Sequence, residues 1–124
     1  MAAQVIMVAS GKGGTGKSTV SVFTGAELAA MGYKVLLVEL DSGLRSIDLI
    51  AGVAGETVYD ISDILSGRCQ AEKAVVQSAL YPGLGIVSAP YTGGHVETEP
   101  LRAFLRKMAP FFDYVVLDTA AGLG

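Results

Sequence analysis

Cysteine, tryptophan and long apolar runs are scarce or absent in this sequence, and two of these shortages exclude whole classes of protein. The single cysteine, Cys69, excludes an internal disulfide and a metal site built from cysteines alone. Apolar runs such as 35–38 and 114–117 are far shorter than the roughly 20 residues that cross a bilayer. The first residues also lack the basic segment that opens a secretory signal peptide, so we expect a cytoplasmic protein.

Positive charge is in short supply as well. Nine Lys and Arg residues face twelve Asp and Glu residues, which gives a net charge of −3 and no general electrostatic reason to bind nucleic acid. Arg102, Arg106 and Lys107 could form a small local patch. The hydrophobic content of 51% in 124 residues favours one compact domain with a sizeable core.

One glycine-rich stretch, 10–19 (SGKGGTGKST), stands between an apolar run and a segment with helical spacing. It contains G-x-x-x-x-G-K-[ST], a phosphate-binding loop that requires this strand–loop–helix setting. The glycines let the backbone come close to a ligand, so that successive N–H groups can point into one hollow. Lys17 adds a mobile charge for phosphate groups, and Ser18 offers a hydroxyl to Mg²⁺. A glycine-rich turn that binds nothing is the alternative.

A second lysine, Lys12, makes this loop more specific. The stretch 12–19 resembles K-G-G-x-G-K-[ST]-[ST], the signature of the MinD/ParA-type ATPases with a deviant Walker A loop. The resemblance implies ATP and Mg²⁺ as cofactors, and a homodimer in which Lys12 reaches the partner's nucleotide and is catalytic together with Lys17. A solvated loop charge is the alternative for Lys12. The expected nucleotide-binding residues of the loop are Gly11, Gly13, Gly14, Thr15, Gly16, Lys17, Ser18 and Thr19.

Two acidic residues, Glu39 and Asp41, follow at the end of the second expected strand. An acidic residue at a strand end beside a phosphate loop can orient a water for attack or hold a Mg²⁺-bound water. The segment 39–52 resembles the switch I pattern of MinD-like proteins, D-x-D-x-G-L-R-x-L-D-L-x-x-G. This resemblance implies that Asp41 positions the attacking water and that Arg45 and Asp48 belong to a dimer interface or switch. A turn-forming role is the alternative for Asp41.

A third acidic residue, Asp118, ends the last expected strand, 113–118. A carboxylate in that place can hold Mg²⁺ through its water shell, as in a Walker B element. Residues 118–122 resemble the family pattern D-[ST]-P-A-G, with Ala120 in place of the proline. The resemblance implies that the N–H of Gly122 meets the γ-phosphate. The expected metal residues are Ser18, Asp118 and Glu39, although the family usually has aspartate where Glu39 stands.

The apolar periodicity predicts an α/β fold of the P-loop NTPase type, with a mostly parallel sheet, helices on both faces, and truncation after the Walker B strand. We expect strands at 4–9, 34–40, 84–90 and 113–118, and helices at 17–31, 60–65, 71–76 and from Thr98 onward. The first helix is expected to pack on the sheet through Val20, Phe23, Ala26, Ala29 and Ala30, and the last through Leu101, Phe104, Leu105 and Met108.

Residues 1–124 are expected to form the N-terminal part of a single P-loop ATPase domain. By resemblance, a whole protein of this kind is an ATP-driven switch that serves a protein partner in positioning the division site or other cargo. A full-length parent could be peripheral at the inner membrane, through a C-terminal tail that this sequence lacks.

Other interpretations stay open. A catalytically incomplete nucleotide-binding or scaffold fragment could self-associate through an exposed sheet edge. An iron–sulfur electron-transfer ATPase is disfavoured because Cys69 is the single cysteine. The single histidine, His95, is better explained as a solvated loop residue than as a general base.

Overall fold

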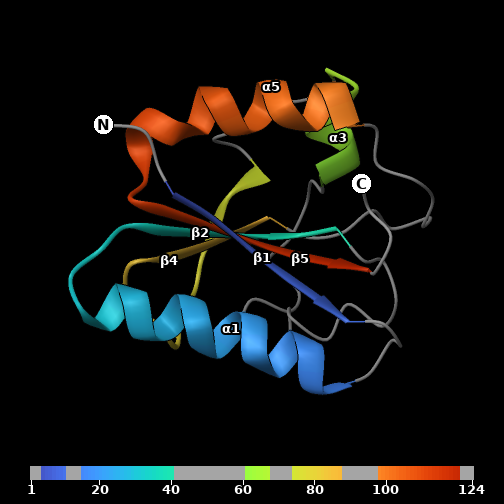
Figure 1. Cartoon of the computed structure of the whole chain (residues 1–124). Helices are drawn as coiled ribbons and strands as arrows, with labels where there is room; N and C mark the ends of the chain where they lie inside the picture. The colour runs from blue at the N-terminus through green and yellow to red at the C-terminus, as the bar shows by residue number, and fades with distance from the viewer. Residues whose placement is uncertain (1–3, 11–14, 41–60, 68–73, 88–97, 121–124) are drawn as a thin grey trace.

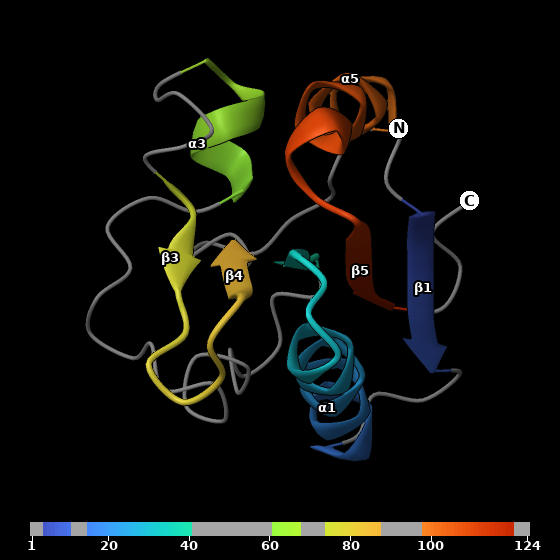
Figure 2. The ribbon, with the colours of Figure 1, turned by 90° about the vertical axis from the view of Figure 1, so that its left-hand side faces the viewer.

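A five-stranded sheet organises the computed structural model, which describes residues 4–10, 15–40, 61–67, 74–87 and 98–120. The strand order is β1-β5-β2-β4-β3, and Figure 2 shows the strands side by side in this order. The first four strands run parallel, whereas β3 is antiparallel to β4. Their bounds are β1 Gln4–Ser10, β5 Tyr114–Ala120, β2 Val35–Glu39, β4 Leu84–Val87 and β3 Val76–Gln77.

Helices cover both faces of this sheet (Figure 1). The helix α1 (Thr15–Ala30) lies against one face, and α3 (Ile61–Leu65) and α5 (Thr98–Met108) lie against the other. A short 3₁₀ helix, η1 (Ala109–Phe111), leads from α5 toward β5. The predicted α/β class, with a mostly parallel sheet between two helical layers, is therefore confirmed.

The core has two parts because strand side chains alternate between the two faces. On β2, Val35 and Leu37 pack in the cluster that includes Val22 of α1. The alternate residues Leu36 and Val38 pack in the cluster of α5, with Leu101, Phe104 and Met108. Every residue of β2 is buried, which explains why its sequence is continuously apolar up to its last residue.

The α5 stripe is as predicted, but the predicted α1 stripe is wrong at Ala30, which is exposed, and at Val20 and Phe23. These two side chains are 54% and 51% exposed, whereas Ser21 and Val22 are fully buried. The helix approaches β4 closely, since a Cβ added to Gly25 would lie 2.9 Å from Leu84 Cδ1. Gly25 therefore lets the helix approach the sheet, Val22 and Leu28 pack on the contact face, and Val20 and Phe23 lie on another side of the helix.

The helix expected at 71–76 is also wrong at its end, because Val76 lies in β3 and pairs with Ile86. Val76 packs partly buried against the α1-side core, and this long-range contact outweighs the local helical pattern. Two glycines form the turns that precede buried strands, since Gly32 and Gly83 adopt φ values of 96° and 90°, which favour glycine.

Because Phe104 is 4% exposed and Phe23 is 51% exposed, the same substitution should have different effects at the two positions. Phe104→Leu should lower the free energy of unfolding by about 1–2 kcal/mol, through lost contacts and a small cavity. Phe23→Leu should cost less than about 0.5 kcal/mol, since a solvated ring loses little. Urea unfolding followed by circular dichroism measures both, and equal losses would contradict the orientation of α1 described here.

Candidate functional site

Two carboxylate residues lie near the carboxyl ends of neighbouring strands; β5 continues two residues past Asp118, to Ala120, so the strand end predicted at 118 is wrong. Glu39, the last residue of β2, is the direct register partner of Asp118 on β5. On its other side Asp118 is the partner of Val8 in β1. Adjacent strands lie about 4.8 Å apart, so the two acidic residues are close neighbours at the carboxyl ends of their strands. This is the edge at which open α/β sheets bind ligands.

The two acidic residues also share a face of the sheet. Side chains alternate along a strand, and Leu37 and Val116, each two positions earlier, belong to the α1-side core cluster. Glu39 and Asp118 therefore project to the face that α1 covers. Their side chains are 1% and 0% exposed, so both lie out of contact with bulk water. Two buried carboxylates on paired residues favour a cation beside them, because burying a negative charge is unfavourable without a compensating positive charge.

The start of α1 provides positive electrostatic potential, opposite in sign to the charge of the two carboxylates. β1 ends at Ser10, and α1 begins at Thr15, two residues before the predicted start. The first-turn backbone N–H groups of an α-helix have no acceptor inside the helix, and they form the positive end of its dipole. The sequence therefore places its phosphate-loop helix with this end directly after the strand that adjoins Asp118.

One buried polar residue, Ser21, lies on the side of α1 that faces the sheet. It is fully buried within a helix that contacts β1, β2 and β5. Lys17 and Ser18 precede it by four and three residues, a spacing that puts positions on one side of an α-helix. Positions 17 and 18 therefore lie on the side of α1 that Ser21 turns toward the sheet. The sequence motifs did not predict that Ser21 is buried against the sheet. Its position one helical turn after Lys17 was the feature that could have indicated this.

The oxygen atoms that the predicted metal residues offer are of the kind that Mg²⁺ binds. This ion prefers carboxylate and hydroxyl oxygens, keeps several waters, and is usually held by one or two carboxylates together with phosphate oxygens. Glu39, Asp118 and the hydroxyl residue Ser18 offer that set of oxygens. Within the described ranges no group of three or more His, Cys, Asp or Glu residues forms a complete metal cage. Such a site fits an ion that arrives with a phosphate ligand.

The structure brings together only part of the predicted site. Glu39 and Asp118 are paired, and the backbone of Thr15, Gly16, Lys17, Ser18 and Thr19 lies in the first turns of α1. The other predicted site residues lie outside the described residues: Gly11, Lys12, Gly13, Gly14, Asp41 and Gly122. Arg45, Asp48, Cys69 and His95 lie outside them too.

In the part of the chain that the structure describes, no helix is long and apolar enough to cross a membrane.

Comparison with known proteins agrees with this arrangement. Residues 3–124 match the family described as AAA domain. The septum site-determining protein MinD of Synechocystis is 35% identical over 122 residues, which cover 97% of this chain and 46% of that protein. In Bacillus subtilis, MinD is likewise 35% identical, with 97% of this chain and 46% of that protein covered.

Solved structures show the same similarity. The MinC:MinD cell division protein complex of Aquifex aeolicus superposes with a TM-score of 0.85 at 36% identity, covering 98% of this chain and 49% of that chain. MinD of Pyrococcus horikoshii complexed with Mg-ADP superposes with a TM-score of 0.79 at 28% identity, covering 98% and 51%.

The present chain spans about half the length of these relatives. The family match, however, extends over nearly all of its residues, and the fold and the strand-end carboxylates lie within the matched range. The chain therefore belongs to the AAA domain family, and over nearly all of its length it is similar to the MinD proteins.

Proposed function

We propose that this chain binds ATP with Mg²⁺ at the start of α1, as the N-terminal part of a MinD-like ATPase domain that acts in spatial positioning. The observation that carries the proposal is the register pairing of Glu39 with Asp118. It puts two buried carboxylates on the face covered by the helix of the phosphate-binding loop. The MinD relative solved with Mg-ADP supports the choice of ligand.

Each part of this edge would act on a different part of the nucleotide. The first-turn N–H groups of α1 would bind phosphate oxygens, and Lys17 would add a full positive charge to them. Asp118 and Glu39 would accept hydrogen bonds from the water shell of Mg²⁺, and Ser18 would contribute a hydroxyl ligand. The ion, when bound with ATP, neutralises negative charge on the β- and γ-phosphates. The protein thereby supplies positioning and electrostatic stabilisation.

Three residues outside the described ranges complete the proposed hydrolytic step. Asp41 would orient the attacking water, and the N–H of Gly122 would meet the γ-phosphate. Lys12 would reach the nucleotide of a partner subunit and stabilise the charge that develops during phosphoryl transfer, as an arginine finger does. Their sequence positions support these roles, because Asp41 and Gly122 follow β2 and β5 closely and Lys12 lies between β1 and α1.

We further propose that the whole protein forms an ATP-dependent homodimer and serves a protein partner of a positioning system. The relative solved as a MinC:MinD complex supports a protein partner. Dimerisation would give the second lysine of the loop a role. Lys17 would bind the nucleotide of its own subunit, and Lys12 would reach the nucleotide of the partner subunit. We place the protein in the cytoplasm, with peripheral contact at the inner membrane in a longer parent.

A second candidate function is favoured by the edge of the sheet. Within the described sheet, β1 pairs with β5 on one side and forms the edge on the other. Val5 of this strand is 50% exposed, so the edge is partly apolar. An open parallel edge is a template for pairing with another chain. The chain could therefore act as a scaffold fragment that self-associates without turnover.

Replacing either paired carboxylate should weaken ATP binding only when Mg²⁺ is present. We expect Asp118→Asn and Glu39→Gln each to lower the affinity for ATP with Mg²⁺ by about ten-fold, because an amide is a poor acceptor for metal-bound water. With EDTA the variants should bind ATP as the original chain does. Isothermal titration calorimetry measures both conditions.

The matched control is Glu27→Gln, which neutralises an exposed carboxylate of α1. It should leave the affinity unchanged in both conditions. An Asp118→Asn protein that binds ATP with Mg²⁺ as tightly as the Glu27→Gln control would contradict the proposed metal role.

A change at Lys12 should separate the two candidate functions. Lys12→Ala should retain ATP binding and lose ATP-dependent dimerisation, measured by analytical ultracentrifugation with and without nucleotide. The control, Arg106→Ala, removes an exposed cation of α5 and should dimerise normally. Dimers that form without nucleotide and persist in Lys12→Ala, with phosphate release at background level, would favour the scaffold function instead.

A further inference from the structure

A cavity lies at the amino-terminal ends of the parallel strands β2, β4 and β5. It has a volume of about 640 Å³ and is lined by residues of β3, β4, α5 and η1 and by residues just before β2, β3, β4 and β5. Lys34 and Gly83 stand directly before the parallel strands β2 and β4, and Phe112 stands just before β5. The amino-terminal ends of the strands therefore form this cavity, whereas the phosphate loop follows their carboxyl ends.

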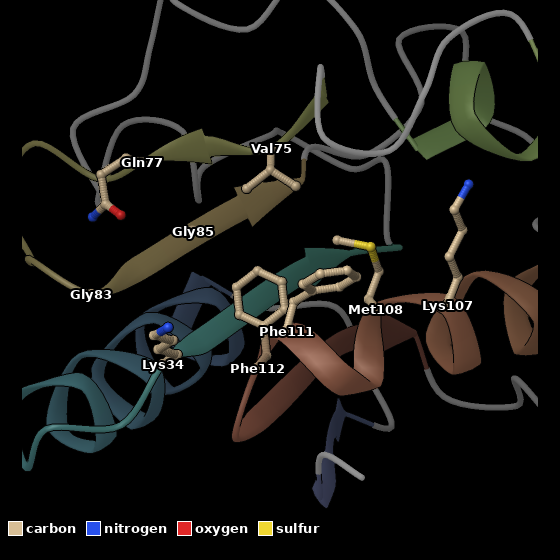
Figure 3. Close-up of a pocket in the computed structure, with 9 residues that line it drawn as sticks. All are labelled: Lys34, Val75, Gln77, Gly83, Gly85, Lys107, Met108, Phe111 and Phe112. Atoms are coloured by element: carbon tan, nitrogen blue, oxygen red, sulfur yellow. The ribbon is translucent and has the colours of Figure 1, made fainter. Parts of the chain in front are cut away.

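The middle of the cavity is apolar and aromatic. Figure 3 shows the rings of Phe111 and Phe112 beside the Met108 side chain, with Val75 above them in this view. Phe111 is 65% exposed, although it is a large aromatic residue. On the floor, Gly85 lacks a side chain, and a Cβ there would lie 2.9 Å from Val75 Cγ1 and 3.9 Å from Phe112 Cε1. A flat apolar group could stack on these rings in an offset or edge-to-face arrangement.

The charge on the cavity wall is positive. Lys34 and Lys107 line it at opposite ends of the labelled group in Figure 3, and no acidic residue is among its described lining residues. The nearest acidic group that the structure ties to the wall is Asp113, whose carboxylate accepts a hydrogen bond of 2.8 Å from the Lys34 backbone N–H. One carboxylate beside two ammonium groups leaves a net positive field, which favours an anionic ligand.

We infer that this cavity binds a small aromatic carboxylate, with its ring system against Phe111, Phe112 and Met108 and its negative charge in the field of Lys34 and Lys107. The volume lies within the roughly 300–1,000 Å³ that is typical of pockets for small organic ligands. The cavity is concave and is bounded by strand residues on one side and by α5 and η1 on the other, which suits a compact molecule better than a flat protein surface.

This site is independent of the proposed nucleotide site. Lys34 of the cavity directly precedes β2 and Glu39 is the last residue of β2, so the length of this strand, about 16 Å, separates them. Occupancy of the cavity should therefore leave the affinity for ATP unchanged, and failure of either proposal leaves the other standing.

Titration with three molecules of one shape and different charge tests the inference by calorimetry. The probes are 2-naphthoate, the neutral naphthalene-2-carboxamide and the cationic 2-naphthylmethylammonium. We expect saturable binding of 2-naphthoate, weaker binding of the carboxamide and no detectable binding of the ammonium compound. Equal binding of the anionic and cationic probes, or no saturable binding of 2-naphthoate, would overturn the inference. Saturation by an acidic aromatic peptide in place of 2-naphthoate would also overturn it.

Variants of the wall locate the binding. Lys34→Gln and Lys107→Gln should each weaken 2-naphthoate roughly two- to five-fold, the range expected for exposed charges, and leave the carboxamide unchanged. Arg106→Gln removes the neighbouring exposed cation, which does not line the cavity, and should have no effect.

A plug variant, Val75→Phe, should abolish binding by filling the cavity, with circular dichroism used to confirm that the fold persists. Undiminished binding in folded Val75→Phe would place the ligand elsewhere and overturn the inference. If Val75→Phe fails to fold, the two lysine variants decide: affinities equal to that of Arg106→Gln would overturn the inference.

Discussion

The parallel register of β5 between β1 and β2 is the constraint on which the site depends. It makes Asp118 the neighbour of Glu39 on one side and of Val8 on the other. Since α1 starts shortly after β1 ends, the first turn of that helix follows the strand that adjoins Asp118. A shift of one residue would turn Asp118 to the α5 face, away from the phosphate-loop helix. The chemistry of this edge therefore follows from strand pairing.

Hydrophobic burial in the core offsets the unfavourable burial of the two carboxylates. Burying a carboxylate is unfavourable, and two on paired residues are more so, unless cations and hydrogen bonds compensate. The interior of β2 is buried on both faces, and the two core clusters lie above and below it. In a close-packed core of this kind the two carboxylates would need little reorganisation to receive a cation. The glutamate at position 39 reaches one methylene further than the aspartate usual in the family, and it lies buried beside Asp118.

The fold could be predicted from sequence wherever a pattern is local. Continuous apolar strands, glycine turns at Gly32 and Gly83, and the α5 stripe all depend on residues close in the chain. The strand β3 could not be predicted from sequence, because its two residues acquire strand geometry only by pairing with β4. The contact face of α1 could not be predicted from sequence either. Gly25 allows the helix to approach the sheet closely, whereas Val20 and Phe23 have the spacing of a buried stripe and are exposed. At the candidate site, the motifs proposed Glu39 and Asp118 separately, whereas their pairing follows from the strand register. The cavity behind Phe111 and Phe112 joins segments distant in sequence, and no motif marks it.

The central claim is that Glu39 and Asp118 together mark the metal site of a bound triphosphate. The most direct measurement is a crystal structure of this chain with Mn²⁺ and a non-hydrolysable ATP analogue, with the metal located by its anomalous scattering. The account predicts one metal peak at the carboxyl ends of β2 and β5, within water-bridged reach of both carboxylates and bound to the phosphates at the first turn of α1. A triphosphate bound elsewhere, or a metal with neither carboxylate in its water shell, would contradict the account.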